Sequence, residues 1–132
     1  MQFALILAPA LALLASGCTT SPERQAEYAA SQAAKVPAAT PVGEPVNCIQ
    51  TSQIRQSNVR NDSVIDFEMT NNRIYRNMLP QSCPGLGLEE RFAYKTTIGQ
   101  LCSVDTITVL RSGMPGPTCG LGAFQRVELT RN

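Results

Sequence analysis

Residues 63–83 hold two runs of β-branched and aromatic residues that are joined by the pair Asn71–Asn72. Asparagine tolerates the positive φ angles that a two-residue hairpin turn requires. We therefore predict a β-hairpin with this pair at its turn. Because antiparallel pairing counts outward from the turn, Phe67 should face Arg76 across the two strands. The remaining segments of the folded part must then pack around this pair of strands.

The predicted register divides the hairpin side chains between two faces, since successive residues of a strand point to opposite sides. The hairpin therefore has a core side and a wetter side. One face carries Ile65, Phe67, Met69, Ile74 and Met78. The other carries Asp66, Glu68, Arg73, Tyr75 and Asn77, with Val64 and Leu79 at the open end.

Arg76 is the most informative residue of the hairpin, because the predicted register puts its guanidinium on the apolar face. A buried charge needs a partner. Alternation places Asp105 on the same face as Ile107 and Val109, so we predict an Arg76–Asp105 ion pair. Two alternatives stay open: Arg76 extends its charged end to water at the sheet edge, or it binds a ligand.

Composition narrows the function classes. The chain has 132 residues, 43% apolar and 16% charged, which fits one domain. Its net charge of +1 is too small and too scattered for a nucleic-acid surface. Histidine is absent, which removes the usual general base near neutral pH and the commonest metal ligand. We expect a non-enzymatic protein with no cofactor, no bound metal and no nucleic-acid partner.

The N-terminus predicts export. Residues 3–15 form an apolar run that is too short to span a bilayer and is typical of a secretory signal. The sequence LASGC at residues 14–18 resembles the lipobox of bacterial lipoproteins, which implies a signal peptide over residues 1–17 and acylation of Cys18. Thr19 after that cysteine implies the periplasmic face of the outer membrane. The alternative is an ordinary signal peptide cut near Ala15.

Residues 18–46 read as a lipid-anchored tether rich in alanine and proline, too poor in large apolar residues to fold alone. Ser21 followed by Pro22 predicts a helix start, and the Ala-rich stretch up to Lys35 continues it. A lone helix of this length is marginal in water, so we interpret the segment as a spacer that holds the domain off the membrane, with a partner-binding helix as the alternative. Three prolines favour an extended linker over residues 36–46. The folded domain is expected over residues 47–132.

Four cysteines fall in this domain: Cys48, Cys83, Cys102 and Cys119. An even count in a small exported domain predicts two disulfides, because the compartment is oxidising and the core is small. The chain has no Cys-x-x-Cys pair and no histidine, which argues against a zinc site or a redox motif. Three connectivities are open. We expect Cys83 to pair with Cys102, and Cys48 with Cys119.

The rest of the domain reads as short strands separated by Pro/Gly loops, which predicts an all-β fold: a small antiparallel barrel or sandwich of about five or six strands. Residues 80–87 and 112–122 should be irregular. The strands expected beside the hairpin are residues 48–51, 54–60, 91–97, 104–110 and 124–129.

The glycine-rich segments that follow Cys83 and Cys119 resemble each other, and under one hypothesis they meet at one end of the domain. By default they are turns beside a disulfide. The sharper hypothesis is a contact surface, since rigidly anchored loops often carry binding. In the second loop, residues 112–122, the candidate contact residues are Met114, Pro115 and Leu121.

Five short segments stand out by their order and spacing: Cys48–Ile49, Tyr75–Pro80, Cys83–Leu86, Phe92–Tyr94 and Leu101–Ile107. Together they resemble a family of small proteobacterial lipoproteins that carry a domain of unknown function. The resemblance covers about residues 46–129. It implies a location in the cell envelope and brings no activity or catalytic residues with it.

The sequence thus favours a non-enzymatic envelope lipoprotein, a structural or protein-interaction module held on the bilayer through acylated Cys18, with an envelope protein as candidate partner. The alternative is a periplasmic inhibitor or small-ligand binder that resembles lysozyme-inhibitor lipoproteins and inserts residues 112–122. A thiol enzyme is a third class, for which neither histidine nor Cys-x-x-Cys supplies an activated thiolate.

Overall fold

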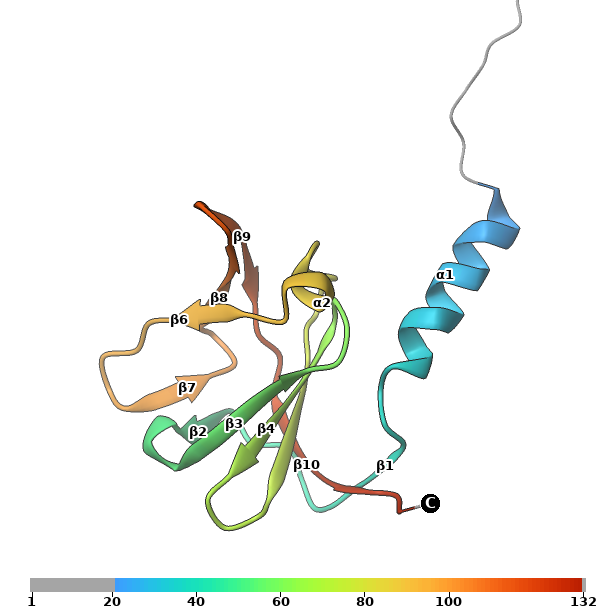
Figure 1. Cartoon of the computed structure of the whole chain (residues 1–132). Coiled ribbons are helices and arrows are strands. Elements are labelled where there is room, and N and C mark those ends of the chain that lie inside the picture. The colour runs from blue at the N-terminus through green and yellow to red at the C-terminus, as the bar shows by residue number, and fades with distance from the viewer. Residues whose placement is uncertain (1–20, 132) are drawn as a thin grey trace, which may run out of the picture.

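The computed structural model describes residues 21–131, which form ten strands in three antiparallel sheets, two α-helices and one 3-10 turn (Figure 1). The predicted all-β class is confirmed. The sheets pack in a sandwich-like arrangement rather than a closed barrel, and the strands are more numerous than expected. The predicted signal peptide and Cys18 lie outside the described residues. No helix within them is long and apolar enough to cross a membrane.

The largest sheet has five strands in the order β1-β10-β5-β4-β3. The hairpin strands β4 and β5 are neighbours in this sheet, and β5 is its middle strand, which confirms the expected place of the hairpin in the fold. Two of the other expected strands join this sheet, together with β1, which was not expected. The bounds are β1 Ala39–Pro41, β3 Ile54–Val59, β4 Val64–Met69, β5 Ile74–Met78 and β10 Phe124–Leu129.

Two smaller sheets complete the domain. β2 pairs with β7, and β6, β8 and β9 form a three-stranded sheet in the order β6-β8-β9. A 3-10 turn, η1 Thr51–Gln53, joins β2 to β3, and the single-turn helix α2 precedes β6. The bounds are β2 Cys48–Gln50, β6 Phe92–Tyr94, β7 Gln100–Cys102, β8 Thr106–Arg111, β9 Met114–Gly120 and α2 Leu86–Glu89.

The hairpin turn has three residues rather than two. Asn72 adopts a φ of 60°. Its N–H donates to Met69 O at 3.0 Å, and Met69 N–H donates to Arg73 O at 2.8 Å. This is a type I turn followed by a left-handed residue, the next most common hairpin connection. The register therefore shifts by one residue, and the predicted pairing of Phe67 with Arg76 is wrong.

A one-residue shift moves every side chain of β5 to the other face. Phe67 now faces Tyr75, and Asp66 faces Arg76. Tyr75 and Asn77 thus join the core side with Ile65, Phe67 and Met69, whereas Ile74 and Met78 lie on the opposite face. Met78 is 67% exposed, although it was expected in the core.

All four domain cysteines form disulfides, as predicted, but the expected pairing is wrong. The bonds are Cys48–Cys102 and Cys83–Cys119. β2 pairs with β7, a strand that the sequence pattern did not reveal, and this ladder puts Cys48 opposite Cys102. Cys119 lies in β9 and is bonded to Cys83 from the loop after β5. The two glycine-rich segments therefore lie beside the same disulfide.

Three segments expected to be irregular or extended are ordered instead. Residues 114–120 form strand β9, which continues a hairpin from β8 despite its two prolines. Residues 86–89 form α2. Residues 39–41 form β1, which pairs with β10, and Val46 bridges Phe124. The segment expected to be a flexible linker is thus part of the sheet.

The core lies between the sheets and is built from aliphatic and aromatic side chains. Phe67 is its centre, in edge-to-face contact with Phe124 and Phe92 at centroid distances of 5.6 and 6.2 Å. Such geometry suits the quadrupoles of aromatic rings. The other fully buried apolar side chains are Ile65, Leu86, Leu101, Ile107 and Val109, with the Cys83 side of a disulfide.

Candidate functional site

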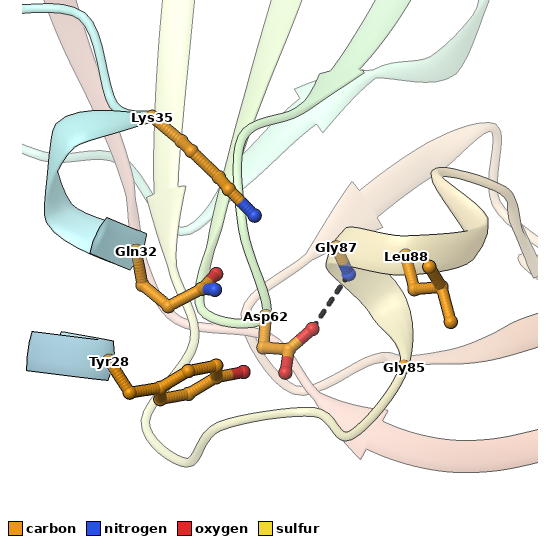
Figure 2. A pocket seen from close by; sticks show the side chains of 7 residues that line it. All are labelled: Tyr28, Gln32, Lys35, Asp62, Gly85, Gly87 and Leu88. Atoms are coloured by element: carbon orange, nitrogen blue, oxygen red, sulfur yellow. Dashed lines mark hydrogen bonds between the residues drawn. The ribbon is translucent and has the colours of Figure 1, made fainter. Parts of the chain in front are cut away.

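A cleft that joins two parts of the chain lies between helix α1, Pro22–Ala34, and the turn formed by α2. Figure 2 shows the side chains of α1 on one side and Asp62, Gly87 and Leu88 on the other. We call this space the α1–α2 cleft. Its volume is about 380 Å³, and it is lined by Tyr28, Gln32, Lys35, Asp62, Gly85, Gly87 and Leu88.

The helical wall of the cleft forms where the sequence predicts a helix. Ser21 caps the N-terminus by accepting a hydrogen bond from Arg24 N–H at 3.4 Å, and Pro22 occupies the first turn. Tyr28, Gln32 and Lys35 are spaced i, i+4 and i+7, which puts them on one helix face. No residue of α1 is fully buried, so packing contributes little to its stability.

Two hydrogen bonds attach this part of the chain to the domain. Asn61 Nδ2 donates to Gln32 O at 2.9 Å, and Arg76 Nη2 donates to Pro37 O at 3.0 Å just after the helix. Both donors are side chains of the large sheet or its β3–β4 loop, and both acceptors are backbone carbonyls. The end of α1 near Gln32 is therefore fixed on the domain.

The opposite wall is built on the β3–β4 loop. Asp62 Oδ1 accepts from Gly87 N–H at 2.7 Å, and Asp62 O accepts from Cys83 N–H at 2.7 Å. A Cβ on Gly87 would lie 3.1 Å from backbone atoms of Asn61 and Asp62, so glycine allows α2 to approach this closely. The carboxylate thus holds α2 in place and lines the cleft as well.

The lining of the cleft is mixed, with charged, polar and apolar side chains. It combines the Lys35 amino group, the Asp62 carboxylate and the Tyr28 hydroxyl with two exposed apolar surfaces, Tyr28 at 59% and Leu88 at 85% exposure. A second hollow of about 260 Å³ continues along Tyr28 toward Ser63 and Ser82. Exposed aromatic and apolar side chains with nearby hydrogen-bonding groups are typical of protein-binding surfaces.

The predicted Arg76–Asp105 ion pair is wrong: Arg76, whose side chain is 12% exposed, lies on the outer face of the sheet and pairs with Asp66. Arg76 Nε lies 2.7 Å from Asp66 Oδ1, and Arg60 Nε lies 2.9 Å from Asp66 Oδ2. The shifted register puts Asp66 directly opposite Arg76. Asp105 instead accepts from the Cys102 N–H at 2.7 Å, in the turn before β8.

The predicted binding loop does not bring its three residues together. Met114 is 66% exposed and Pro115 is exposed, both at the start of β9, whereas Leu121 is only 4% exposed and belongs to the core. Within the described residues no group of three or more histidine, cysteine, aspartate or glutamate side chains is placed to hold a metal ion.

Sequence reasoning placed Tyr28, Gln32 and Lys35 in a tether that was expected to act as a spacer, with a partner-binding helix as the alternative. Their spacing on the predicted helix was a signal for a shared face. The position of that face could not be found from the pattern, because the bond that fixes α1 uses a backbone carbonyl of Gln32. Every residue has a backbone carbonyl, so its use as an acceptor does not alter the pattern of side chains.

The comparisons with known proteins give one match. A model described as "Family of unknown function (DUF6491)" covers residues 1–128. No curated protein matches the chain. No solved structure matches it either.

Proposed function

The chain belongs to a family of unknown function, DUF6491, and from this premise we propose that it is a non-enzymatic lipoprotein of the bacterial envelope. In this proposal Cys18 is acylated and holds the protein on the periplasmic face of the outer membrane. The domain then acts as a protein-interaction module that presents the α1–α2 cleft to another envelope protein.

Two features support the envelope location. The sequence at residues 14–18 resembles a lipobox after an apolar run, and the domain carries two disulfides, Cys48–Cys102 and Cys83–Cys119. Disulfides persist mainly in oxidising compartments, which include the bacterial periplasm. Both features point to export, and they come from separate parts of the chain.

The single observation that carries the proposal is the bond from Asn61 Nδ2 to Gln32 O. It ties the domain to a helix whose N-cap, Ser21, is three residues from Cys18. A helix of 13 residues is about 20 Å long at 1.5 Å per residue. An acylated Cys18 would therefore hold the cleft at a defined and short distance from the bilayer, where a membrane protein can reach it.

The lipid anchor is tested by the intact mass of the protein from the membrane fraction. We expect an N-terminus at residue 18 with the added mass of acyl chains, and release into the soluble fraction by Cys18→Ser. Several acyl chains give durable anchoring, since each buried methylene contributes about 0.8 kcal/mol. A mature N-terminus without lipid at Cys18 would remove this part of the proposal.

The cleft is tested by photo-crosslinking in intact cells with a reactive residue in place of Tyr28. The matched control carries the same residue at Ala30, which is exposed and lies about 160° away on the helix. We expect one defined protein adduct from position 28 that Leu88→Glu abolishes, and no such adduct from position 30. Equal adducts from both positions would contradict the cleft as the contact surface.

The alternative function, an inhibitor that inserts residues 112–122, now depends on a hairpin tip rather than on a loop. Gly113 has a φ of 81° at the turn between β8 and β9, and Met114 beside it is 66% exposed. Met114→Ala leaves the core untouched. Under this alternative the variant loses binding of its target while Tyr28→Ala keeps it.

A further inference from the structure

The Cys48–Cys102 disulfide lies at the edge of the fold, in its smallest sheet. Its two residues face each other in the β2–β7 ladder, which contains only three residue pairs. Cys48 is partly exposed and Cys102 is 8% exposed. The bond therefore joins a partly exposed cysteine to a nearly buried one.

A cleft of about 220 Å³ reaches this bond. Cys102 forms part of its lining, and the loop before β7 and the turn before β8 form its rim. Two large apolar side chains stand on that rim: Ile98 is 69% exposed and Val104 is 88% exposed. Exposed apolar side chains around one recess mark a contact site for another protein more often than scattered ones do.

The other disulfide differs in a way that matters for exchange chemistry. Cys83 is fully buried in the core, while Cys119 is partly exposed beside a hollow of about 250 Å³. A thiolate that attacks Cys119 must expel Cys83 as a thiolate into apolar surroundings, and burial disfavours that charge. Attack on Cys83 itself is blocked by the core. Neither direction of exchange is favourable.

We propose that Cys48–Cys102 is a thiol-exchange site, opened by a dithiol oxidoreductase of the envelope that docks on Ile98 and Val104. The proposal goes beyond the interaction function above and uses none of the residues of the α1–α2 cleft. The partner is identified by chemistry: it supplies two thiols and an apolar surface around its reactive cysteine. The cleft beside Cys102 and the partly exposed position of Cys48, which leaves as the thiolate, both select this bond.

The reaction balances between the two proteins. A thiolate of the partner forms a bond to Cys102 Sγ, the Cys48–Cys102 bond breaks, and its electron pair leaves on Cys48 Sγ, which takes up a proton. The second thiolate of the partner then attacks the mixed disulfide and releases Cys102, which is protonated in turn. The domain disulfide is reduced by two electrons, and the partner dithiol is oxidised to a disulfide.

The fold is arranged to survive this opening. The β2–β7 pair forms a sheet of its own and shares no strand with the five-stranded sheet. Ile49 and Leu101 are the next residue pair of this ladder after the two cysteines. They are 5% and 0% exposed and remain packed in the core cluster. Reduction thus frees two thiols while apolar packing still holds both strands on the domain.

The order of opening is tested on the full chain, purified in detergent. Dithiothreitol is added, free thiols are trapped by alkylation at intervals, and the labelled cysteines are identified by mass. We expect Cys48 and Cys102 to be labelled about tenfold or more faster than Cys83 and Cys119. Labelling of all four cysteines together, or of Cys83 and Cys119 first, overturns the proposal.

The docking rim is tested with thioredoxin, kept reduced by its reductase, as the protein dithiol. Ile98→Ser/Val104→Ser should open the bond about tenfold more slowly with thioredoxin, the effect of losing two apolar interface contacts. Its rate with dithiothreitol should be unchanged, which shows that the bond itself is unaffected.

The matched control is Met78→Ser/Leu110→Ser, which removes two exposed apolar side chains that belong neither to this rim nor to the α1–α2 cleft. Its thioredoxin rate should equal that of the parent. A rim variant that reacts with thioredoxin as fast as the parent, or one slowed equally with both reductants, overturns docking on Ile98 and Val104.

Discussion

The two faces of the five-stranded sheet bury their residues by different means. Phe67 and Asp66 are neighbours in β4, and both are fully buried. Phe67 points into the core and contacts two other aromatic rings. Asp66 points to the outer face, where the side chains of Arg60 and Arg76 cover it, and these are 23% and 12% exposed.

This difference shows that equal burial does not mean an equal role. The core face is stabilised by apolar area removed from water, which any gap reduces. The outer face is stabilised by a cluster of charged side chains, and removing one member leaves the charge of its partner uncompensated. Substitutions on the core face should therefore cost stability singly, whereas those on the outer face should depend strongly on their partners.

The largest effect is expected for Phe67→Ala. Removing a fully buried ring at the centre of the core should lower the free energy of unfolding by about 4 kcal/mol, through lost transfer energy and the cavity left behind. The measurement is urea denaturation followed by circular dichroism. A loss below about 2 kcal/mol would mean that the two sheets close over the gap more easily than a packed core allows.

A somewhat smaller effect is expected for Asp66→Ala, about 3 kcal/mol, because it leaves two arginines facing each other on the sheet. The partial exposure of both arginine side chains places this value at the low end for breaking a buried ion pair. The same denaturation assay measures it.

The comparison of the two faces is sharpened by Asp66→Ala/Arg76→Ala. We expect the double variant to be more stable than the sum of the single losses predicts, with a coupling of about 2 kcal/mol. Strict additivity would show that the outer cluster behaves like independent surface charges and would remove the contrast with the core.

The prediction for Asn77→Ala tests the one amide on the core face. Asn77 is fully buried, and its side chain donates to Gly122 O at 2.7 Å and accepts from Gly122 N–H at 2.9 Å. Its loss leaves both backbone groups unpaired and should cost about 2 kcal/mol. The matched control on the outer face is Asn58→Ala, whose partly exposed amide donates to Glu68 Oε1 at 2.8 Å and whose loss should cost less, about 1 kcal/mol. Equal losses would contradict this contrast.

The sequence was sufficient to find seven of the ten strands but not the register of the hairpin. Alternation of apolar residues placed the hairpin and five further strands near their observed positions. The pair Asn71–Asn72 permits both a two-residue turn and a type I turn with a left-handed residue. The two differ by one residue, which decides whether Arg76 faces Phe67 or Asp66. Only the packing of the whole sheet selects between them.

Disulfide pairing and the candidate site were beyond the sequence for a related reason. Cys48 meets Cys102 because β2 pairs with β7, and a three-residue strand has too short a pattern to detect. β9 was missed because Pro115 and Pro117 argue against a strand, although prolines are tolerated at a sheet edge, where β9 lies. The α1–α2 cleft depends on one side chain that reaches a backbone carbonyl 29 residues away.

The smallest effect is expected for Asn61→Asp, which removes the hydrogen bond between the β3–β4 loop and helix α1. The variant keeps the Oδ1 acceptor for Ser63 N–H and removes the Nδ2 donor to Gln32 O. One such bond contributes about 1 kcal/mol, and a helix as exposed as α1 has little else to hold it. We expect faster amide hydrogen exchange in α1 with unchanged exchange in β4. If α1 keeps its protection, contacts other than this bond hold the helix, and the domain and helix are then coupled through the Arg76–Pro37 bond of the outer face.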